Sequence, residues 1–77
     1  MKNQFGLICP IPWESIPSDF NWIAQNADGR FYMYQQRPFT PVSGEWLSSS
    51  FDEFYVLYIL SPPPKDVTKC LWERPKN

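Results

Sequence analysis

Few residues of this chain are able to perform acid–base chemistry. Histidine is absent, which removes the commonest general base, the histidine of nucleophilic triads and the usual nitrogen ligand of zinc. Asp28 and Glu45 are the best carboxylate pair for a hydrolase, but such a site needs a deep cleft, which a chain of 77 residues hardly provides. We therefore predict no catalytic residue, no enzymatic activity and no cofactor.

A possible metal loop is better explained as a turn. Asn26, Asp28 and Gly29 resemble the start of a calcium loop, yet Arg37 occupies the position where such a loop carries its bidentate glutamate. Asn, Asp and Gly are also the residues that tight turns prefer. The sequence therefore predicts a turn here and no metal site.

Cys9 and Cys70 are the remaining candidate metal ligands. They belong to no Cys-x-x-Cys pair, and no histidine completes a set, so we predict buried thiols without a metal. The N-terminal stretch MKNQFGLICPIPW does not fit a signal peptide, and the chain has no run of about 18 apolar residues. We expect a soluble cytoplasmic protein without a membrane partner, in which both thiols stay reduced; a disulfide between them stays an open alternative.

Aromatic and basic residues alternate around one segment, which raises the possibility of nucleic-acid binding. Arg30, Tyr32, Tyr34 and Arg37 are the types that bind single strands by stacking and by charge. However, the chain has only seven lysines and arginines and a net charge of −1, so the contribution from phosphate contacts is small. A single-stranded nucleic acid is the weaker candidate partner.

A protein partner fits the composition better, because the chain is rich in the residue types that anchor protein interfaces. The candidate partner-binding residues are Arg30, Tyr32, Tyr34, Arg37, Trp72 and Arg74. The same enrichment would also mark a very small core. If these residues form an interface, Tyr32, Tyr34 or Trp72 to Ala should weaken a complex without lowering the melting temperature. Trp22 and Trp46 are expected in the core, so their removal should cost stability.

The whole chain, residues 1–77, is expected to form one small, mainly β domain with a small helical element. Apolar residues make up 43% of the sequence, enough for one core. Prolines exclude regular helix and central strand from residues 1–18, which we predict to be an extended arm. Residues 20–60 should form a three- to four-stranded antiparallel meander, and residues 62–77 a proline spacer followed by a short helical turn.

The meander begins with two strands, over 21–26 and 30–36, joined by Asp28-Gly29. A third strand is predicted over 42–48, started or bulged by Gly44. With Asp28-Gly29 as a two-residue loop, Ala24 lies opposite Met33. One face then forms the core and carries Trp22, Ala24, Phe31 and Met33. The second face carries Ile23, Gln25, Tyr32 and Tyr34. It is either covered by the arm and the C-terminal segment, which we favour, or open as a contact surface.

The last third of the chain carries an ambiguous segment and a cap signal. Residues 51–60 fit a strand or a helix, and their aromatic and β-branched content favours the strand. Asp66 should cap a helical turn that places Val67, Cys70 and Leu71 on one side. Arg74 is expected at the end of this turn, where a cation suits the negative pole of a helix.

Several landmarks occur in a fixed order: Trp22, Asp28-Gly29 with aromatic residues after it, Pro38, Trp46 after a glycine, and the ending LWERP. This order resembles small uncharacterised accessory proteins of bacteriophages and prophages, with a W-x-A-x-x-x-D-G hairpin and an L-x-E-R-P ending. Asn26 and Cys70 depart from that pattern. The resemblance implies a protein of the bacterial host cell that binds and inhibits a host or defence protein by covering its surface. A self-associating structural or assembly protein, such as a homodimer, is a further alternative.

Overall fold

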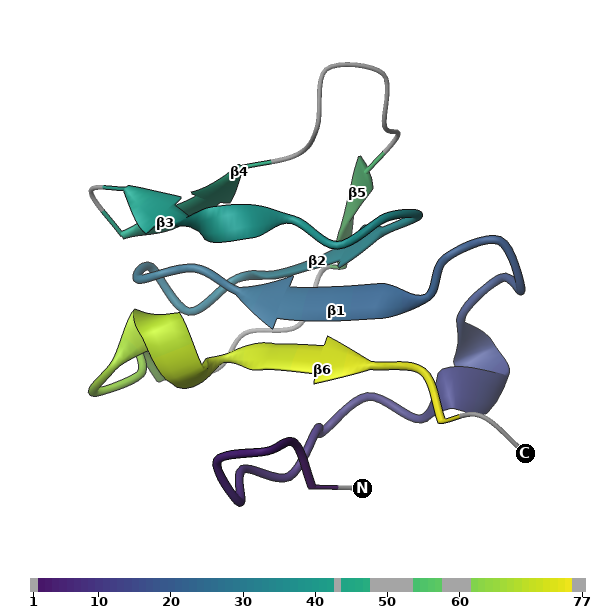
Figure 1. Cartoon of the computed structure of the whole chain (residues 1–77), viewed down its shortest axis with the longest axis horizontal. Helices are drawn as coiled ribbons and strands as arrows, with labels where there is room; N and C mark the ends of the chain where they lie inside the picture. Colours follow the sequence, from purple (N-terminus) through teal and green to yellow (C-terminus); the bar gives the residue numbers. More distant parts are fainter. Residues whose placement is uncertain (1, 43, 48–53, 58–61, 76–77) are drawn as a thin grey trace.

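The computed structural model describes residues 2–42, 44–47, 54–57 and 62–75. It is built mainly from strands, as predicted (Figure 1). In chain order these are β1 (Trp22–Gln25), β2 (Phe31–Tyr34), β3 (Phe39–Val42), β4 (Glu45–Leu47), β5 (Phe54–Leu57) and β6 (Leu71–Glu73). Two 3₁₀-helices, η1 (Trp13–Ser15) and η2 (Val67–Lys69), complete the described elements. None of the helices in this part of the chain is long and apolar enough to cross a membrane.

The strands form one four-stranded sheet and one separate hairpin. The order in the sheet is β5-β2-β1-β6, with antiparallel neighbours throughout, and β3 pairs with β4 alone. The predicted strands over 21–26 and 30–36 are therefore confirmed as the centre of the sheet. The predicted third strand exists as β4, but it pairs with β3 and not with β2. The strand β3 was not predicted, because its sequence lies among prolines. The prediction of one continuous meander is therefore wrong after β2. Residues 54–57 form a strand, as favoured, and the rest of 51–60 lies outside the described residues.

The predicted register between β1 and β2 is wrong by one residue. Gln25 lies opposite Phe31, and Ala24 lies opposite Tyr32 rather than Met33. The reason is a three-residue loop: the Asn26 amide donates to the Arg30 carbonyl (2.9 Å), and Gly29 has a φ of 94°. A turn of this length closes with a glycine in the left-handed region and bulges one strand. Because of this shift, Ala24 shares a face of the sheet with Tyr32, and Ile23 shares the opposite face with Met33.

With this register, both faces of the sheet are covered. One core cluster contains Ile23 and Phe31 from the sheet, Trp72 from β6, and residues of the N-terminal arm that include Cys9, Ile11, Ile16 and Phe20. The other contains Ala24 and Tyr34 from the sheet and Trp46 from β4, with Trp22, Tyr32, Val67 and Leu71 packed against it. The arm covers one face and the β3–β4 hairpin covers the other. The favoured prediction of covered faces is confirmed: Val67 and Leu71 of the C-terminal segment contribute to the cover, and the β3–β4 hairpin adds a cover that was not predicted.

The β3–β4 hairpin is attached to the loop after β1. The backbone amide of Trp46 donates to Oδ1 of the buried Asn26 (3.0 Å), and the Ala27 amide donates to the Gly44 carbonyl (2.8 Å). Gly44 has a φ of 84°, a conformation that residues with a Cβ rarely adopt. Gly44 directly precedes β4, which fits the prediction that it starts this strand, whereas the register shift between β3 and β4 lies between Phe39 and Val42.

The C-terminal segment is a helical turn followed by a strand. Asp66 caps η2 as predicted, accepting a hydrogen bond from the Thr68 amide (3.0 Å). The helical conformation then ends, because the next residues pair with β1 as β6 at an edge of the sheet. In a strand, neighbouring side chains point to opposite faces, so Cys70 packs in one core cluster and Leu71 against the other. The prediction that they share one side is therefore wrong.

Candidate functional site

The structure separates the six predicted partner-binding residues, and two of them are core residues. Tyr34 is 1% exposed and Trp72 is 4% exposed, and they lie in different core clusters. The Trp72 indole donates to the carbonyl of Leu7 (2.9 Å) in the arm. Both side chains are almost wholly buried, so neither can anchor a partner as an exposed aromatic residue would, although Trp72 also lines the hollow described below. They supply buried area instead, as large aromatic residues do in a small core.

Arg74 also has a structural position. Its guanidinium donates to the carbonyls of Trp13 (3.5 Å), Ile16 (3.1 Å), Pro17 (2.8 Å) and Phe20 (2.8 Å). The expected position at the end of a helix is wrong, because Arg74 follows strand β6 and its partners are carbonyls of the arm. It therefore holds the arm against the end of the sheet.

Tyr32 and Arg30 contribute little to a shared site. Tyr32 is half-buried against the second core cluster. Arg30 lies in the β1–β2 loop and pairs with Asp28 at 3.7 Å, with both side chains more than half exposed. Exposed ion pairs of this kind contribute little to stability or to selective binding.

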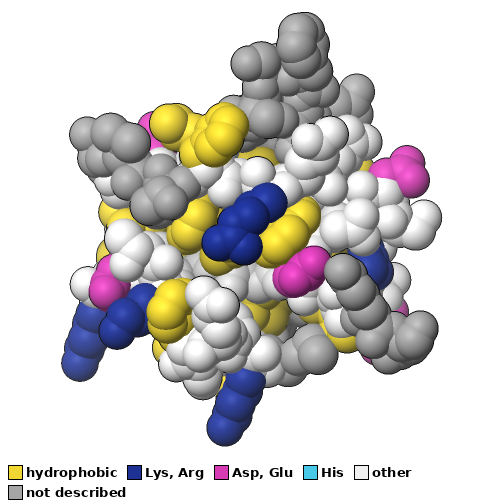
Figure 2. Space-filling view, viewed as in Figure 1, with side chains coloured by type: hydrophobic (Ala, Val, Ile, Leu, Met, Phe, Trp, Pro, Cys, Tyr) yellow, Lys and Arg dark blue, Asp and Glu magenta, His cyan; other side chains and the backbone are white. Residues whose placement is uncertain are grey.

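Arg37 is the predicted residue that the structure places at an accessible, shaped surface. Its guanidinium carbon lies 5.3 Å from the centroid of the Trp22 ring, within the range of a cation–π contact. Both side chains line a hollow of about 410 Å³, together with Trp46, Leu71 and residues of η2, β6 and the arm. On the face drawn in Figure 2, a basic side chain lies among hydrophobic ones near the middle of the surface.

Two indole groups beside this hollow lack acceptors. The Nε1 atoms of Trp13 and Trp46 are buried, and neither has a hydrogen-bond partner among the described residues. Both tryptophans belong to the lining of the hollow. Buried donors without a partner are uncommon and costly, and each calls for a specific explanation.

The sequence analysis missed a pair of exposed apolar residues on the β3–β4 hairpin. Phe39 and Leu47 are opposite each other in the register and are 57% and 44% exposed. Their neighbour Trp46 points the other way and is buried. Figure 2 shows hydrophobic side chains at the surface over this hairpin. The alternation of Glu45, Trp46 and Leu47 was the available signal, but it does not tell which side of the hairpin meets the sheet.

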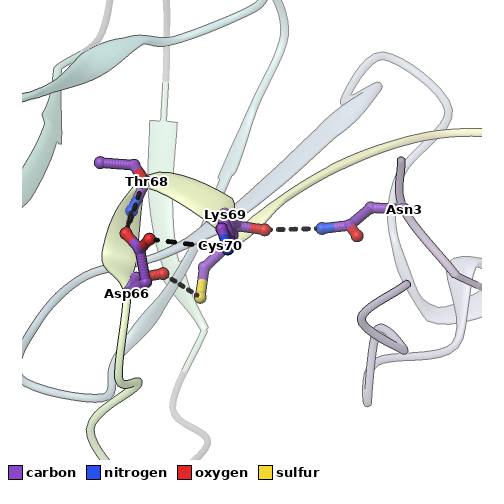
Figure 3. Close-up of polar contacts among 5 residues, drawn as sticks. All are labelled: Asn3, Asp66, Thr68, Lys69 and Cys70. Atoms are coloured by element: carbon purple, nitrogen blue, oxygen red, sulfur yellow. Dashed lines mark hydrogen bonds and ion pairs between the residues drawn. The ribbon is translucent and has the colours of Figure 1, made fainter. Parts of the chain in front are cut away.

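A second exposed apolar group lies on the N-terminal arm. Phe5, Leu7 and Ile8 are 48%, 39% and 63% exposed. Asn3 organises this loop: its Oδ1 accepts from the amides of Phe5 (2.9 Å) and Leu7 (3.0 Å). Its Nδ2 donates to the carbonyls of Lys69 (2.7 Å) and Leu71 (3.0 Å), and the first of these contacts is drawn in Figure 3. The side chain therefore fixes the arm along the outer edge of β6.

The titratable groups with shifted pKa values in the described part of the chain are two cysteines and one aspartate. Cys9 and Cys70 are buried free thiols, and burial raises the pKa of each, with the charge of Asp66 adding to the effect at Cys70. The pKa of the Asp66 carboxyl is lowered by its hydrogen bonds from the side chain and amide of Thr68. Among the described residues, no group of His, Cys, Asp and Glu could hold a metal ion.

Comparisons with known proteins give no indication of function, so the surface of the molecule has to provide it. No family model, curated protein or solved structure matches the chain. The described residues offer an exposed apolar pair on the β3–β4 hairpin and a hollow lined by the cation Arg37, and no group of them could hold a metal ion. These are the features of a binding surface.

Proposed function

We propose that this protein is a small protein-binding module that acts by covering the surface of a partner protein. The observation that carries the proposal is the exposed pair Phe39 and Leu47, side by side on the outer face of the β3–β4 hairpin. Single exposed apolar residues are common, but a cross-strand pair on a fixed hairpin forms a continuous apolar contact. Burying a side chain of either type contributes about 1.5–3 kcal/mol.

The hairpin is suited to an interface because its inner side is already fixed. Trp46 anchors it in the second core cluster, and Asn26 holds its backbone. A surface that is ordered before binding loses less conformational entropy on association. Phe39 and Leu47 would form the apolar centre of the contact, with Arg37 at its side.

The partner that we propose is a host or defence protein in a bacterial cell. This part rests on the resemblance to accessory proteins of bacteriophages and prophages, in which inhibition by occlusion is frequent. The mechanism needs no bond to be made or broken. The module would occupy a surface that the partner uses for another contact.

The described surface gives little support to nucleic-acid binding. Stacking of bases requires exposed aromatic faces beside cations. Tyr34 is buried, Tyr32 is half-buried, and Arg37 lies over the Trp22 ring. The aromatic and basic segment therefore lacks the open stacking platform that its sequence suggested.

The test is a pull-down from bacterial lysate with the tagged protein, with and without nuclease, followed by reconstitution with the purified partner. The substitutions Phe39→Ser and Leu47→Ser together should abolish retention without lowering the melting temperature. Ile8→Ser is the control, because it removes an apolar side chain of the arm that is at least as exposed as Phe39 and Leu47. It should leave binding unchanged.

Three results would contradict the proposal. Binding could survive the double substitution, the partner could disappear with nuclease treatment, or no partner could be retained. A solution mass of twice 9.1 kDa that the double substitution halves would instead assign the hairpin to self-association.

A further inference from the structure

We infer that the hollow beside Arg37 receives a carboxylate of the partner protein, an aspartate or glutamate side chain next to an apolar residue. The inference rests on the proposed function and names the chemistry of the partner segment. It is carried by Arg37, by the apolar walls of the hollow and by the unpartnered indole of Trp46.

The guanidinium of Arg37 makes no hydrogen bond or ion pair with the described residues. Arg30 is paired with Asp28, and Arg74 donates to carbonyls of the arm. Within the described residues, the guanidinium of Arg37 contacts the Trp22 ring and has no carboxylate or carbonyl partner. The aromatic contact restrains the guanidinium, while its N–H groups remain available for a planar, doubly bonded carboxylate.

The lining of the hollow combines apolar walls with an excess of positive charge. Trp22, Trp46 and Leu71 supply the apolar surface. Among the charged residues of the lining, Lys2 and Arg37 are cations and Glu73 is an anion. Since the whole chain has a net charge of −1, this excess is local. It favours a segment in which one carboxylate adjoins an apolar side chain.

Trp46 gives an independent indication of an acceptor. The residue is 7% exposed, and its Nε1 has no acceptor among the described residues. A ligand oxygen in the hollow is the type of group that this donor lacks. A carboxylate has about four lone-pair sites on its two oxygens, so it can accept from Arg37 and from this indole together.

A nucleic acid offers anionic oxygens too, but the observations favour the peptide. Two cations around one hollow neutralise few phosphates, and the binding of a polyanion depends on many such contacts. The volume of about 410 Å³ suits one or two side chains. An oligonucleotide is therefore included in the experiment as a second probe.

The experiment is a titration of the ¹⁵N-labelled full chain, followed by the indole N–H signals of its four tryptophans. The probe is the blocked dipeptide N-acetyl-Leu-Glu-amide, and N-acetyl-Leu-Gln-amide is its uncharged match. The glutamate peptide should shift the Trp22 and Trp46 signals saturably. Trp72 also lines the hollow, but its signal should move less than those of Trp22 and Trp46, because its indole N–H already donates to the Leu7 carbonyl. The glutamine peptide should bind about tenfold more weakly, as expected for the loss of a charge-assisted hydrogen bond.

Variants separate the site from general charge effects. Arg37→Gln should remove the preference for the glutamate peptide, whereas Arg30→Gln removes a cation remote from the hollow lining and should preserve it. Trp46→Phe keeps an aromatic ring, removes the donor and should weaken the peptide complex. Equal binding of the two peptides, no saturable shift, an unchanged preference in Arg37→Gln, or a stronger response to oligothymidine would each overturn the inference.

The titration also distinguishes this inference from the proposed function. The double variant Phe39→Ser, Leu47→Ser should still bind the glutamate peptide, since neither residue lines the hollow. If the protein partner is lost in that variant and the peptide still binds, both proposals stand. If the peptide fails on the wild type while the partner is retained, the carboxylate site alone is wrong.

Discussion

The guanidinium of Arg74 lies over the ring of Trp13, with its central carbon 4.9 Å from the ring centroid. The same group donates hydrogen bonds to carbonyls along the arm, including those of Ile16 and Phe20. The backbone amide of Arg74 donates to the carbonyl of Asn21 (2.7 Å), just before β1. One residue near the end of the chain therefore ties the arm, the first strand and β6 together. It was predicted as a contact residue and is instead part of the framework that supports the surface.

Replacing Arg74 should destabilise the protein even when the charge is kept. Lysine presents a point charge and cannot satisfy several divergent carbonyls at once. We expect Arg74→Lys to lower the free energy of unfolding by about 2–4 kcal/mol, since hydrogen bonds to charged groups contribute about 1.5–3 kcal/mol each. Urea denaturation measures this. Arg30→Lys is the control, because its exposed ion pair should contribute less than about 1 kcal/mol. A variant Arg74→Lys as stable as the wild type would show that these contacts are dispensable.

Asn3 should keep the N-terminal loop ordered through the hydrogen bonds of its Oδ1 and Nδ2 atoms. Asn3→Ala removes the acceptor used by the Phe5 and Leu7 amides and the donor used by the Lys69 and Leu71 carbonyls. It should cost about 1–2 kcal/mol, less than four separate hydrogen bonds would give, because three of the four lie at exposed positions where water can replace them. Asn3→Asp keeps the acceptor but loses the donor. Amide hydrogen exchange of Phe5 and Leu7 should therefore be fastest in Asn3→Ala and intermediate in Asn3→Asp. Equal protection in all three proteins would contradict this role.

Features encoded by neighbouring residues were predictable from the sequence. The β1–β2 hairpin, the proline-rich arm and the Asp66 cap of η2 each depend on residues close in the chain. The register was wrong because Asp28-Gly29 also fits a three-residue loop, in which Gly29 takes the left-handed position. Asn26 and Ala27 of this turn also bond to the β3–β4 hairpin. The strand β6 was missed because Leu71–Glu73 is short and is defined by its pairing with β1.

The candidate site was only partly predictable. Arg37, predicted as a partner-binding residue, is exposed and lines the hollow, and its role in binding stays a prediction. The roles of Tyr34 and Trp72 were wrong because aromatic residues are equally typical of interfaces and of small cores. Phe39 and Leu47 were missed because their exposure depends on which side of β3–β4 packs against the sheet. That choice is made by Trp46 and by the hydrogen bond to Asn26.

Glycine positions with the same backbone conformation should differ in their tolerance of alanine. Gly6 and Gly44 have φ values of 81° and 84°. A Cβ added to Gly6 would meet nothing within 4 Å, whereas one added to Gly44 would lie 2.8 Å from the Cβ of Ala27. Gly6→Ala should cost about 1–2 kcal/mol from the backbone alone, and Gly44→Ala roughly 1–3 kcal/mol more from overpacking.

A double-mutant cycle isolates this contact between Gly44 and Ala27. In the background Ala27→Gly, the additional cost of Gly44→Ala should disappear, so the two substitutions should be strongly non-additive. Thermal unfolding of the four proteins gives the coupling. Additive effects would mean that the hairpin relaxes away from the β1–β2 loop without a penalty.

The buried thiols should make the protein less stable in alkaline solution. Burial raises the pKa of Cys9 and Cys70 above the ordinary value of 9.0. Between the unfolded and the folded pKa, the unfolded chain has lost the thiol proton while the folded protein still holds it. The unfolded state then binds fewer protons, so the free energy of unfolding falls as the pH rises. The contribution of the thiols is fully present below the unfolded pKa and is lost as the pH rises through the folded pKa.

The thiol contribution can be separated from that of tyrosine and lysine, which titrate at higher pH. Urea denaturation from about pH 8 to about pH 9.5 should show a steeper loss of stability in the wild type than in the double variant Cys9→Ala, Cys70→Ala. In the same range iodoacetamide should modify both cysteines slowly in the folded protein and rapidly in urea, because the thiolate is the reactive form and both side chains are buried. Parallel pH profiles for the two proteins, or equal alkylation rates with and without urea, would show that these thiols are exposed in solution and that the arm does not stay closed over the core.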